Sequence, residues 1–181
     1  KLVLYLHLQI PHKDIDETLI SRHGNNMVPI TRIKKFSGKP LLNLVKKGEA
    51  LKVGQRKEKK SEMGPLVTKE HLAKVKSYVD IGEKEGAQLI VDGRNLKLQG
   101  YENGYYIGGC LFDHVTKDMK IYKEEIFGPV LSVVRVKNFD EALKLVNDHE
   151  FGNGASIFTR DGDSGRTFSS KAKIGMIGIN I

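Results

Sequence analysis

Cysteine is nearly absent from this sequence, since Cys110 is the only one among 181 residues. A single thiol excludes an internal disulfide framework and a cysteine-built zinc cluster, and it favours a reducing compartment. The six histidines are scattered without the spacing of metal ligands, so we expect no metal site. Long apolar runs are missing too, because none approaches the roughly 20 residues that a membrane-spanning helix requires. We therefore expect no membrane partner.

The sequence also lacks a recognisable phosphate-binding loop. Nothing in residues 1–40 supplies a strand, a phosphate-binding helix start and a second strand in succession, as a dinucleotide-binding unit requires. The glycines at Gly100 and Gly104 indicate turns instead. Residues 161–165 begin like a calcium loop but lack the closing glutamate, so a turn and a helix cap are the better interpretation.

Positive charge is plentiful but unevenly placed. The formal net charge is +8, and residues 1–62 hold 14 lysines and arginines against 6 acidic residues, whereas residues 63–181 hold 16 of each. The densest run extends from Arg56 to Lys60. A basic patch can contact phosphates, but no aromatic residues alternate with this one, as a single-strand binding surface requires. A solvated surface or linker is therefore favoured, and nucleic acid is an unexpected partner.

Regular patterning in the second part of the chain predicts alternating helices and strands. Helices are predicted over residues 69–84, 139–148 and 163–173. Strands are predicted over residues 87–91, 130–136, 155–159 and 174–180, with shorter extended pieces at 105–107 and 111–112. Thr68 and Asn138 are suited to cap the first two helices, and Gly86 to end the first. This alternation is typical of an α/β fold, a mostly parallel sheet with covering helices.

Residues 1–40 show no clear period and contain several breakers. Their pattern allows a strand over residues 1–10, and a short helix is allowed over residues 41–51. We therefore divide the chain into a divergent, basic segment at 1–40 and an ordered part at 41–181.

Three segments of the ordered part resemble the aldehyde dehydrogenase family. Lys123-Glu-Glu-Ile-Phe-Gly-Pro-Val130 resembles the E-E-x-F-G-P motif of that family, which is long and specific. Met63-Gly-Pro-Leu-Val67 resembles its G-P-L segment, and Tyr101-Glu-Asn-Gly-Tyr-Tyr-Ile-Gly108 resembles its G-Y-[FY]-[IV] stretch. Their order and spacing agree with the family.

Four further segments resemble one branch, the methylmalonate-semialdehyde (malonate-semialdehyde) dehydrogenases. They are Phe151-Gly-Asn-Gly-Ala155, Gly175-Met-Ile-Gly-Ile-Asn180, Asp92-Gly-Arg94 and Tyr101-Glu-Asn-Gly104. The resemblance covers about residues 41–181. It implies a partial aldehyde dehydrogenase catalytic domain, without the dinucleotide-binding domain.

The resemblance also implies a chemistry. The parent enzyme converts a semialdehyde, CoA and NAD to an acyl-CoA, carbon dioxide and NADH, in valine, pyrimidine or inositol catabolism. In such enzymes a cysteine thiolate attacks the aldehyde, hydride passes to NAD, and CoA takes the acyl group. The family further implies a homo-oligomer, in the mitochondrial matrix or the bacterial cytoplasm.

Two residues receive cofactor roles from the resemblance. Glu125 matches the residue that hydrogen-bonds the nicotinamide ribose, and Phe127 matches the aromatic that packs beside the nicotinamide. Without the motif, a surface salt bridge for Glu125 and a core position for Phe127 would be the favoured interpretations.

No catalytic residue is assigned, because the sequence departs from the family at the nucleophile. The position of the family cysteine corresponds to residues 24–27, which read Gly-Asn-Asn-Met. Cys110 stands where the family usually has threonine, and we interpret it as a small buried thiol. The chain is therefore expected to be inactive alone.

Two alternatives remain open. The chain could be a non-catalytic binding protein that uses its basic first third on RNA or an acidic partner. It could also be a mis-assembled gene product in which residues 1–40 replace the true cysteine segment.

Overall fold

A seven-stranded sheet organises the described part of the chain. The computed structural model describes residues 3–8, 18–23, 45–46, 48–55, 57 and 60–181, with the backbone alone for the first two ranges. The strand order is β3-β4-β5-β1-β2-β6-β7. These strands are β1 (Val3–Leu8), β2 (Thr18–His23), β3 (Gln88–Val91), β4 (Cys110–Asp113), β5 (Val130–Val136), β6 (Gly154–Phe158) and β7 (Met176–Ile179).

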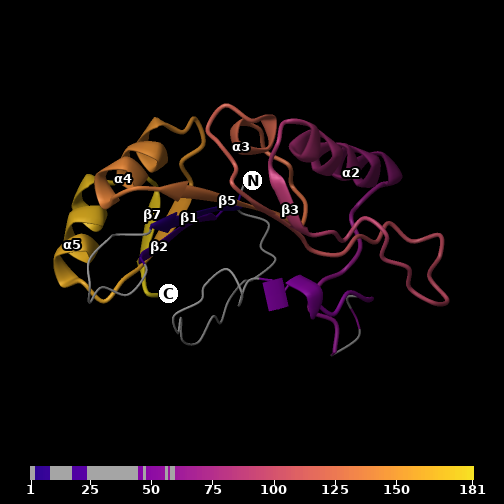
Figure 1. Cartoon of the computed structure of the whole chain (residues 1–181). Coiled ribbons are helices and arrows are strands. Elements are labelled where there is room, and N and C mark those ends of the chain that lie inside the picture. Colours follow the sequence, from indigo (N-terminus) through magenta and orange to yellow (C-terminus); the bar gives the residue numbers. More distant parts are fainter. Residues whose placement is uncertain (1–2, 9–17, 24–44, 47, 56, 58–59) are drawn as a thin grey trace.

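Four helices gather on one side of the sheet, as Figure 1 shows. These four are α2 (Lys69–Lys84), α3 (Lys120–Lys123), α4 (Phe139–Asp148) and α5 (Gly162–Lys171). The described residues between 45 and 55 lie on the other side (Figure 1). None of the described helices combines the length and apolarity needed to cross a membrane.

Most of the described strands run in one direction. Parallel pairing joins β4 to β5, β5 to β1 and β6 to β7. Antiparallel pairing joins β3 to β4, β1 to β2 and β2 to β6. Strands β2 and β3 therefore run against the other five. The α/β class is confirmed, in a mixed sheet whose order does not follow the chain because β1 and β2 enter between β5 and β6.

The capping residues begin the helices where the sequence predicts. The Thr68 side chain accepts from the backbone N–H of His71 at 3.1 Å, and Asn138 accepts from that of Glu141 at 2.9 Å. Asp161 caps α5 by accepting from the N–H groups of Asp163 and Ser164. Each cap satisfies backbone donors that the first helical turn leaves without a partner. The helix cap predicted within residues 161–165 is thus Asp161, while residues 162–165 form the first turn of α5 instead of a separate turn.

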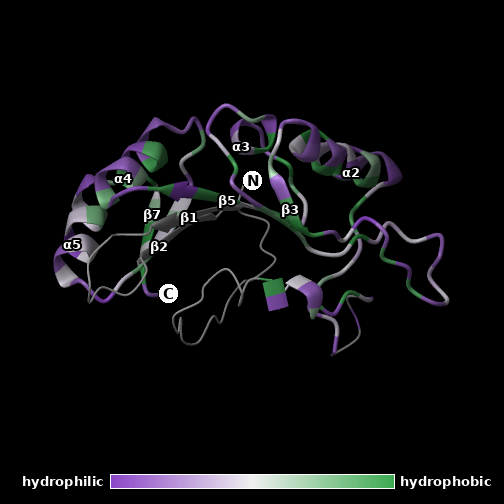
Figure 2. Ribbon diagram, viewed as in Figure 1, coloured by the Kyte–Doolittle hydropathy of each residue, from purple (hydrophilic) through white to green (hydrophobic). Residues whose placement is uncertain are grey.

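The core lies between the sheet and the helices. Phe112, Ile121 and Phe168 are fully shielded from solvent. A Cβ on Gly82 would lie 2.9 Å from carbon atoms of both Phe112 and Ile121, so α2 approaches β4 this closely only with glycine. Figure 2 shows hydrophobic residues along β5 and on the helix sides that face the sheet. Burial of such side chains contributes about 1.5–3 kcal/mol each.

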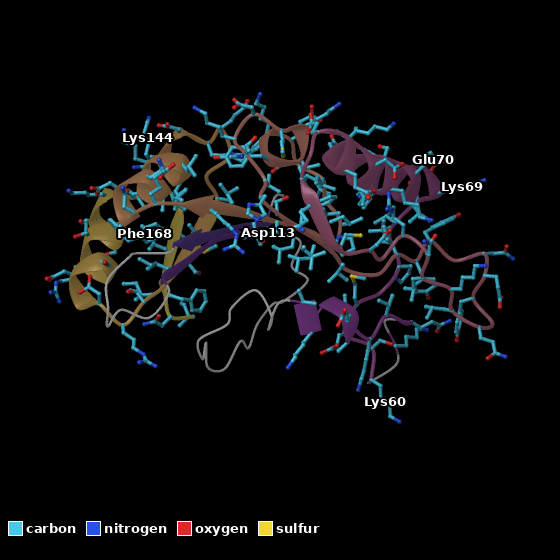
Figure 3. All side chains as sticks on the ribbon, in the orientation of Figure 1. Lys60, Lys69, Glu70, Asp113, Lys144 and Phe168 are labelled. Carbon is cyan, nitrogen blue, oxygen red and sulfur yellow. The ribbon has the colours of Figure 1, made fainter. Side chains whose placement is uncertain are left out.

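A buried carboxylate lies at the end of β4, the strand next to the edge strand β3. Asp113 is 2% exposed and accepts hydrogen bonds from the guanidinium of Arg135, the two shortest at 2.9 and 2.8 Å (Figure 3). Burial alone would raise the pKa of Asp113, but the bonds from Arg135 and from the N–H of His114 lower it below its usual range. A buried charge needs such a partner, because its desolvation is otherwise costly.

Some elements differ from the prediction. Strand β2 and the short helix α3 were not predicted. Residues 105–107 lie outside any strand, although an extended piece was expected there. Of the helix predicted over residues 41–51, positions 45, 46, 48 and 49 are helical, while 41–44 and 47 lie outside the described residues.

Candidate functional site

The loop of residues 124–129 carries both predicted cofactor residues. It leads from the end of α3 into β5. Glu125 is half-buried, and Phe127 is 40% exposed. Phe127 also has a φ of 55°, in the left-handed region that an aromatic residue rarely adopts. Strained backbone of this kind clusters at functional sites. The interpretation of Phe127 as a core residue is therefore wrong.

Glu124 holds the first turn of this loop. The hydroxyl of Tyr78, in α2, donates a hydrogen bond to the Glu124 carboxylate. The ammonium of Lys120 lies 3.6 Å from the other carboxylate oxygen. Burial and the neighbouring Glu124 together raise the pKa of Tyr78 to about 12. Tyr78 therefore stays protonated and keeps donating at neutral pH.

The second half of the loop also rests on α2. The Nε2 atom of His71 lies 2.9 Å from the carbonyl oxygen of Phe127. A Cβ on Gly128 would lie 2.7 Å from both γ carbons of Val75, so glycine is required where the loop crosses the helix. Neither His71 nor Tyr78 was predicted from the sequence to be a functional residue. Their partners lie 56 and 46 residues away along the chain, so no local pattern could have indicated them.

The other segments that resemble the family meet this loop at the end of the sheet where β4 and β5 begin. The N–H of Leu66 donates to the carbonyl of Tyr105 at 2.8 Å, which joins the 63–67 and 101–108 segments. The N–H of Cys110 donates to the carbonyl of Pro129, also at 2.8 Å. These bonds place the segments beside the start of β5. Figure 3 shows Lys69 and Glu70 at the amino end of α2.

The branch-specific segments meet in the same way at the start of β6 and β7. The N–H of Gly175 donates to the carbonyl of Gly152, and that of Met176 to Asn153, both at 2.9 Å. His149 connects this region to α3, because its Nε2 lies 2.9 Å from the carbonyl of Tyr122. Segments far apart in the sequence thus lie at the same end of the sheet, where β4, β5, β6 and β7 begin.

A second polar cluster, here named the Arg94 corner, links β3 to α2. Its guanidinium contacts Asp92 at 2.6 Å, Asp80 at 2.5 Å and Glu83 at 2.7 Å. The hydrogen bond from Arg94 is the main cause that lowers the pKa of Asp92. A Cβ on Gly93 would lie 2.2 Å from the carbonyl carbon of Gly108. The corner is therefore a structural arrangement that joins the end of β3 to α2.

Cys110 belongs to this corner as a buried thiol, as interpreted from the sequence. It is 2% exposed, and its sulfur accepts from the N–H of Gly93 at 3.3 Å. Burial raises the pKa of Cys110 to about 11. A buried, protonated thiol is a poor nucleophile.

Two sets of positions noted in the sequence lie outside the described residues. Residues 24–27, the expected position of the family cysteine, lie outside the described residues. So do Arg56, Glu58 and Lys59 of the basic run.

Comparison with known sequences identifies the family. A model described as the aldehyde dehydrogenase family matches residues 35–181. A malonate-semialdehyde dehydrogenase from Pseudomonas aeruginosa is 52% identical over 141 residues, which are 78% of this chain and 28% of that protein. The mitochondrial, acylating methylmalonate-semialdehyde/malonate-semialdehyde dehydrogenase of Bos taurus is 41% identical, over 78% of this chain and 26% of its own length.

Solved structures of the same kind of enzyme are also similar to this chain. A Sinorhizobium meliloti 1021 protein, named as a methylmalonate-semialdehyde dehydrogenase and complexed with NAD, is 57% identical with a TM-score of 0.73, over 78% of this chain and 28% of that one. A methylmalonate-semialdehyde dehydrogenase from Oceanimonas doudoroffii is 46% identical with a TM-score of 0.74, over 77% and 29%. The chain thus spans less than a third of these relatives. On this evidence it belongs to the aldehyde dehydrogenase family.

Proposed function

We propose that this chain is part of the catalytic domain of an NAD-dependent, CoA-acylating methylmalonate- or malonate-semialdehyde dehydrogenase. The supporting observation is the 124–129 loop, in a chain that is 52% identical to a malonate-semialdehyde dehydrogenase. The loop exposes an aromatic ring and holds a half-buried carboxylate two residues away. These groups suit the nicotinamide end of NAD, because a ring packs on a ring and a carboxylate accepts from hydroxyls.

The proposed roles follow from the chemistry of each side chain. Glu125 accepts hydrogen bonds from the hydroxyls of the nicotinamide ribose, which fixes the position of the ring. Phe127 packs beside the nicotinamide and excludes water from it. NAD, when bound, accepts the hydride from the substrate. The overall conversion takes a semialdehyde, CoA and NAD to an acyl-CoA, carbon dioxide and NADH.

The nucleophile and most of the NAD site belong, in this proposal, to parts of the protein outside the described residues. Cys110 does not fill the role, because its sulfur is buried and protonated. We therefore propose that residues 1–181 do not turn over alone, and that the active enzyme is a homo-oligomer of a longer polypeptide. The relatives come from bacteria and, in the bovine case, from mitochondria by name.

The first test is the intact mass of the native polypeptide, captured with a reagent against residues 124–130. A chain more than twice this length, which forms NADH only with semialdehyde and CoA present, supports the proposal. A native chain of the present size that forms NADH, and loses this activity in Cys110→Ala, contradicts it. The alternative of RNA binding through the basic first third finds no support among the relatives.

A further inference from the structure

Helix α2 presents one side to the 124–129 loop. His71, Val75 and Tyr78 stand four and three residues apart, a spacing that places side chains on the same side of an α-helix. Each contacts a different part of the loop: His71 the carbonyl of Phe127, Val75 the backbone at Gly128, and Tyr78 the carboxylate of Glu124. The loop is therefore held at both ends by a single rigid element.

The contact from His71 lies at the strained residue. Phe127 has a φ of 55°, which costs free energy for a residue with a bulky side chain. Such a conformation persists only when surrounding contacts determine it. The Nε2–H of His71 reaches the Phe127 carbonyl at 2.9 Å, and the missing Cβ of Gly128 lets the backbone lie against Val75. These contacts fix the peptide group that aims the Phe127 ring outward.

The contact from Tyr78 holds the first residue of the loop. Glu124 has extended backbone angles, φ −100° and ψ 150°, so the chain leaves helical geometry at this residue. Tyr78 and Lys120 hold the Glu124 carboxylate against the helices. The Glu124 carboxylate is thereby fixed at the start of the loop, immediately before Glu125. With a pKa of about 12, Tyr78 maintains its hydrogen bond over the whole physiological range.

We infer that His71 and Tyr78 are positioning residues, which act through the 124–129 loop to place Glu125 and Phe127 for the cofactor. We call the contacts of His71 and Tyr78 with the 124–129 loop the clamp. The inference rests on the proposed function for the identity of the ligand, but the clamp itself is a property of the chain. Neither residue needs to touch the cofactor. Their removal should loosen the loop and weaken cofactor binding without changing the reaction that bound cofactor undergoes.

The clamp is tested by hydrogen–deuterium exchange of the peptide 124–130 in the native full-length polypeptide. Tyr78→Phe and His71→Leu should each speed exchange in this peptide about tenfold, the factor that one ordinary hydrogen bond represents. A peptide covering β6 should be unchanged. Tyr122→Phe is the matched control, because Tyr122 is as buried as Tyr78 but its hydroxyl reaches the carbonyl of Leu145 in α4. Unchanged exchange at 124–130 in both variants overturns the clamp.

The positioning role is tested by kinetics of the same polypeptides. Both variants should raise the KM for NAD about tenfold, while kcat and the KM for the semialdehyde stay within about twofold. His71→Gln, which keeps an N–H donor near the Nε2 position, should restore most of the NAD affinity. Faster exchange with an unchanged KM for NAD overturns the positioning role. A wild-type protein that does not bind NAD overturns the proposed function and this role together. In that case the hydrogen–deuterium exchange experiment still tests whether His71 and Tyr78 hold the loop.

Discussion

The Arg94 corner and the 124–129 loop are both built against α2, yet they differ in what they leave exposed. In the corner, one guanidinium contacts three carboxylates, and only 22% of the Arg94 side chain is exposed. In the loop, the fixed contacts are made by backbone atoms and Glu124, while Phe127 keeps 40% of its surface exposed. In the corner the charged groups contact one another, whereas in the loop a strained backbone at Phe127 presents its ring to solvent.

Charge density is therefore a poor guide to the candidate site in this chain. Arg94 has the denser cluster of charges and a raised pKa, caused first by its hydrogen bond to Asp92. These ion pairs join residues of β3 and α2 and of the segment that follows β3, so the cluster stabilises the link between the two elements. An exposed aromatic residue with a positive φ has no comparable structural benefit, which makes it the better indicator of a site.

The largest effect should come from Gly93→Ala in the corner. The new Cβ would lie 2.2 Å from the carbonyl carbon of Gly108, and backbone cannot move aside as a side chain can. We expect a loss of about 4 kcal/mol or more in the free energy of unfolding. Chemical unfolding monitored by circular dichroism measures it. Gly128→Ala should cost less, because its new Cβ meets only the side chain of Val75.

The next effect concerns the thiol in the corner. With a pKa of about 11, about one Cys110 in a thousand is a thiolate at pH 8, against about one in ten at the ordinary value of 9.0. Alkylation by iodoacetamide should therefore be at least about 100-fold slower in the native than in the unfolded protein. Mass spectrometry of the Cys110 peptide measures both rates. Equal rates would show that the thiol is accessible and ionised, and would reopen its role as a nucleophile.

The features that the sequence predicted correctly are local. Thr68, Asn138 and Asp161 begin helices because a short polar side chain satisfies N–H groups two or three residues ahead. Burial of Cys110 was also predicted, on its position in the family motif. The place of β1 and β2 within the sheet was not, because no local pattern states which strands become neighbours.

The contacts that build the candidate site connect distant residues. His71 and Phe127 are 56 residues apart, and Gly93 and Gly108 meet only because β3 and β4 pair. The motif did indicate that Glu125 and Phe127 belong together. It could not indicate that Glu124 is held by Tyr78, since that bond depends on how α2 packs against α3.

A smaller effect is expected from Arg94→Met, which removes the contacts with Asp80, Glu83 and Asp92. The variant should lose about 2 kcal/mol of stability at pH 7. Asp92 has a lowered pKa in the folded state, so its contribution is full above its ordinary value of 3.8 and is lost as the pH falls through the folded value. The difference between wild type and variant should therefore narrow below about pH 4 in urea unfolding experiments.

The control for this prediction is Arg166→Met, because Arg166 pairs with Asp163 on the exposed surface of α5. Its loss should change stability by less than about 0.5 kcal/mol. If Arg94→Met is as mild as Arg166→Met, the corner is no more than a surface ion pair.

In the loop, Phe127→Asn should affect stability less than Arg94→Met does in the corner. Asparagine adopts a positive φ more readily than phenylalanine, so relief of strain offsets part of the lost packing. We expect unfolding free energy to change by no more than about 1 kcal/mol, while affinity for NAD in the full-length protein falls about tenfold. The same substitution at Phe168, which is fully buried, should cost about 4 kcal/mol or more. Thermal unfolding and NAD titration separate the two results. A Phe127→Asn variant as unstable as Phe168→Asn would show that the ring serves the fold, and the distinction between corner and loop would then fail.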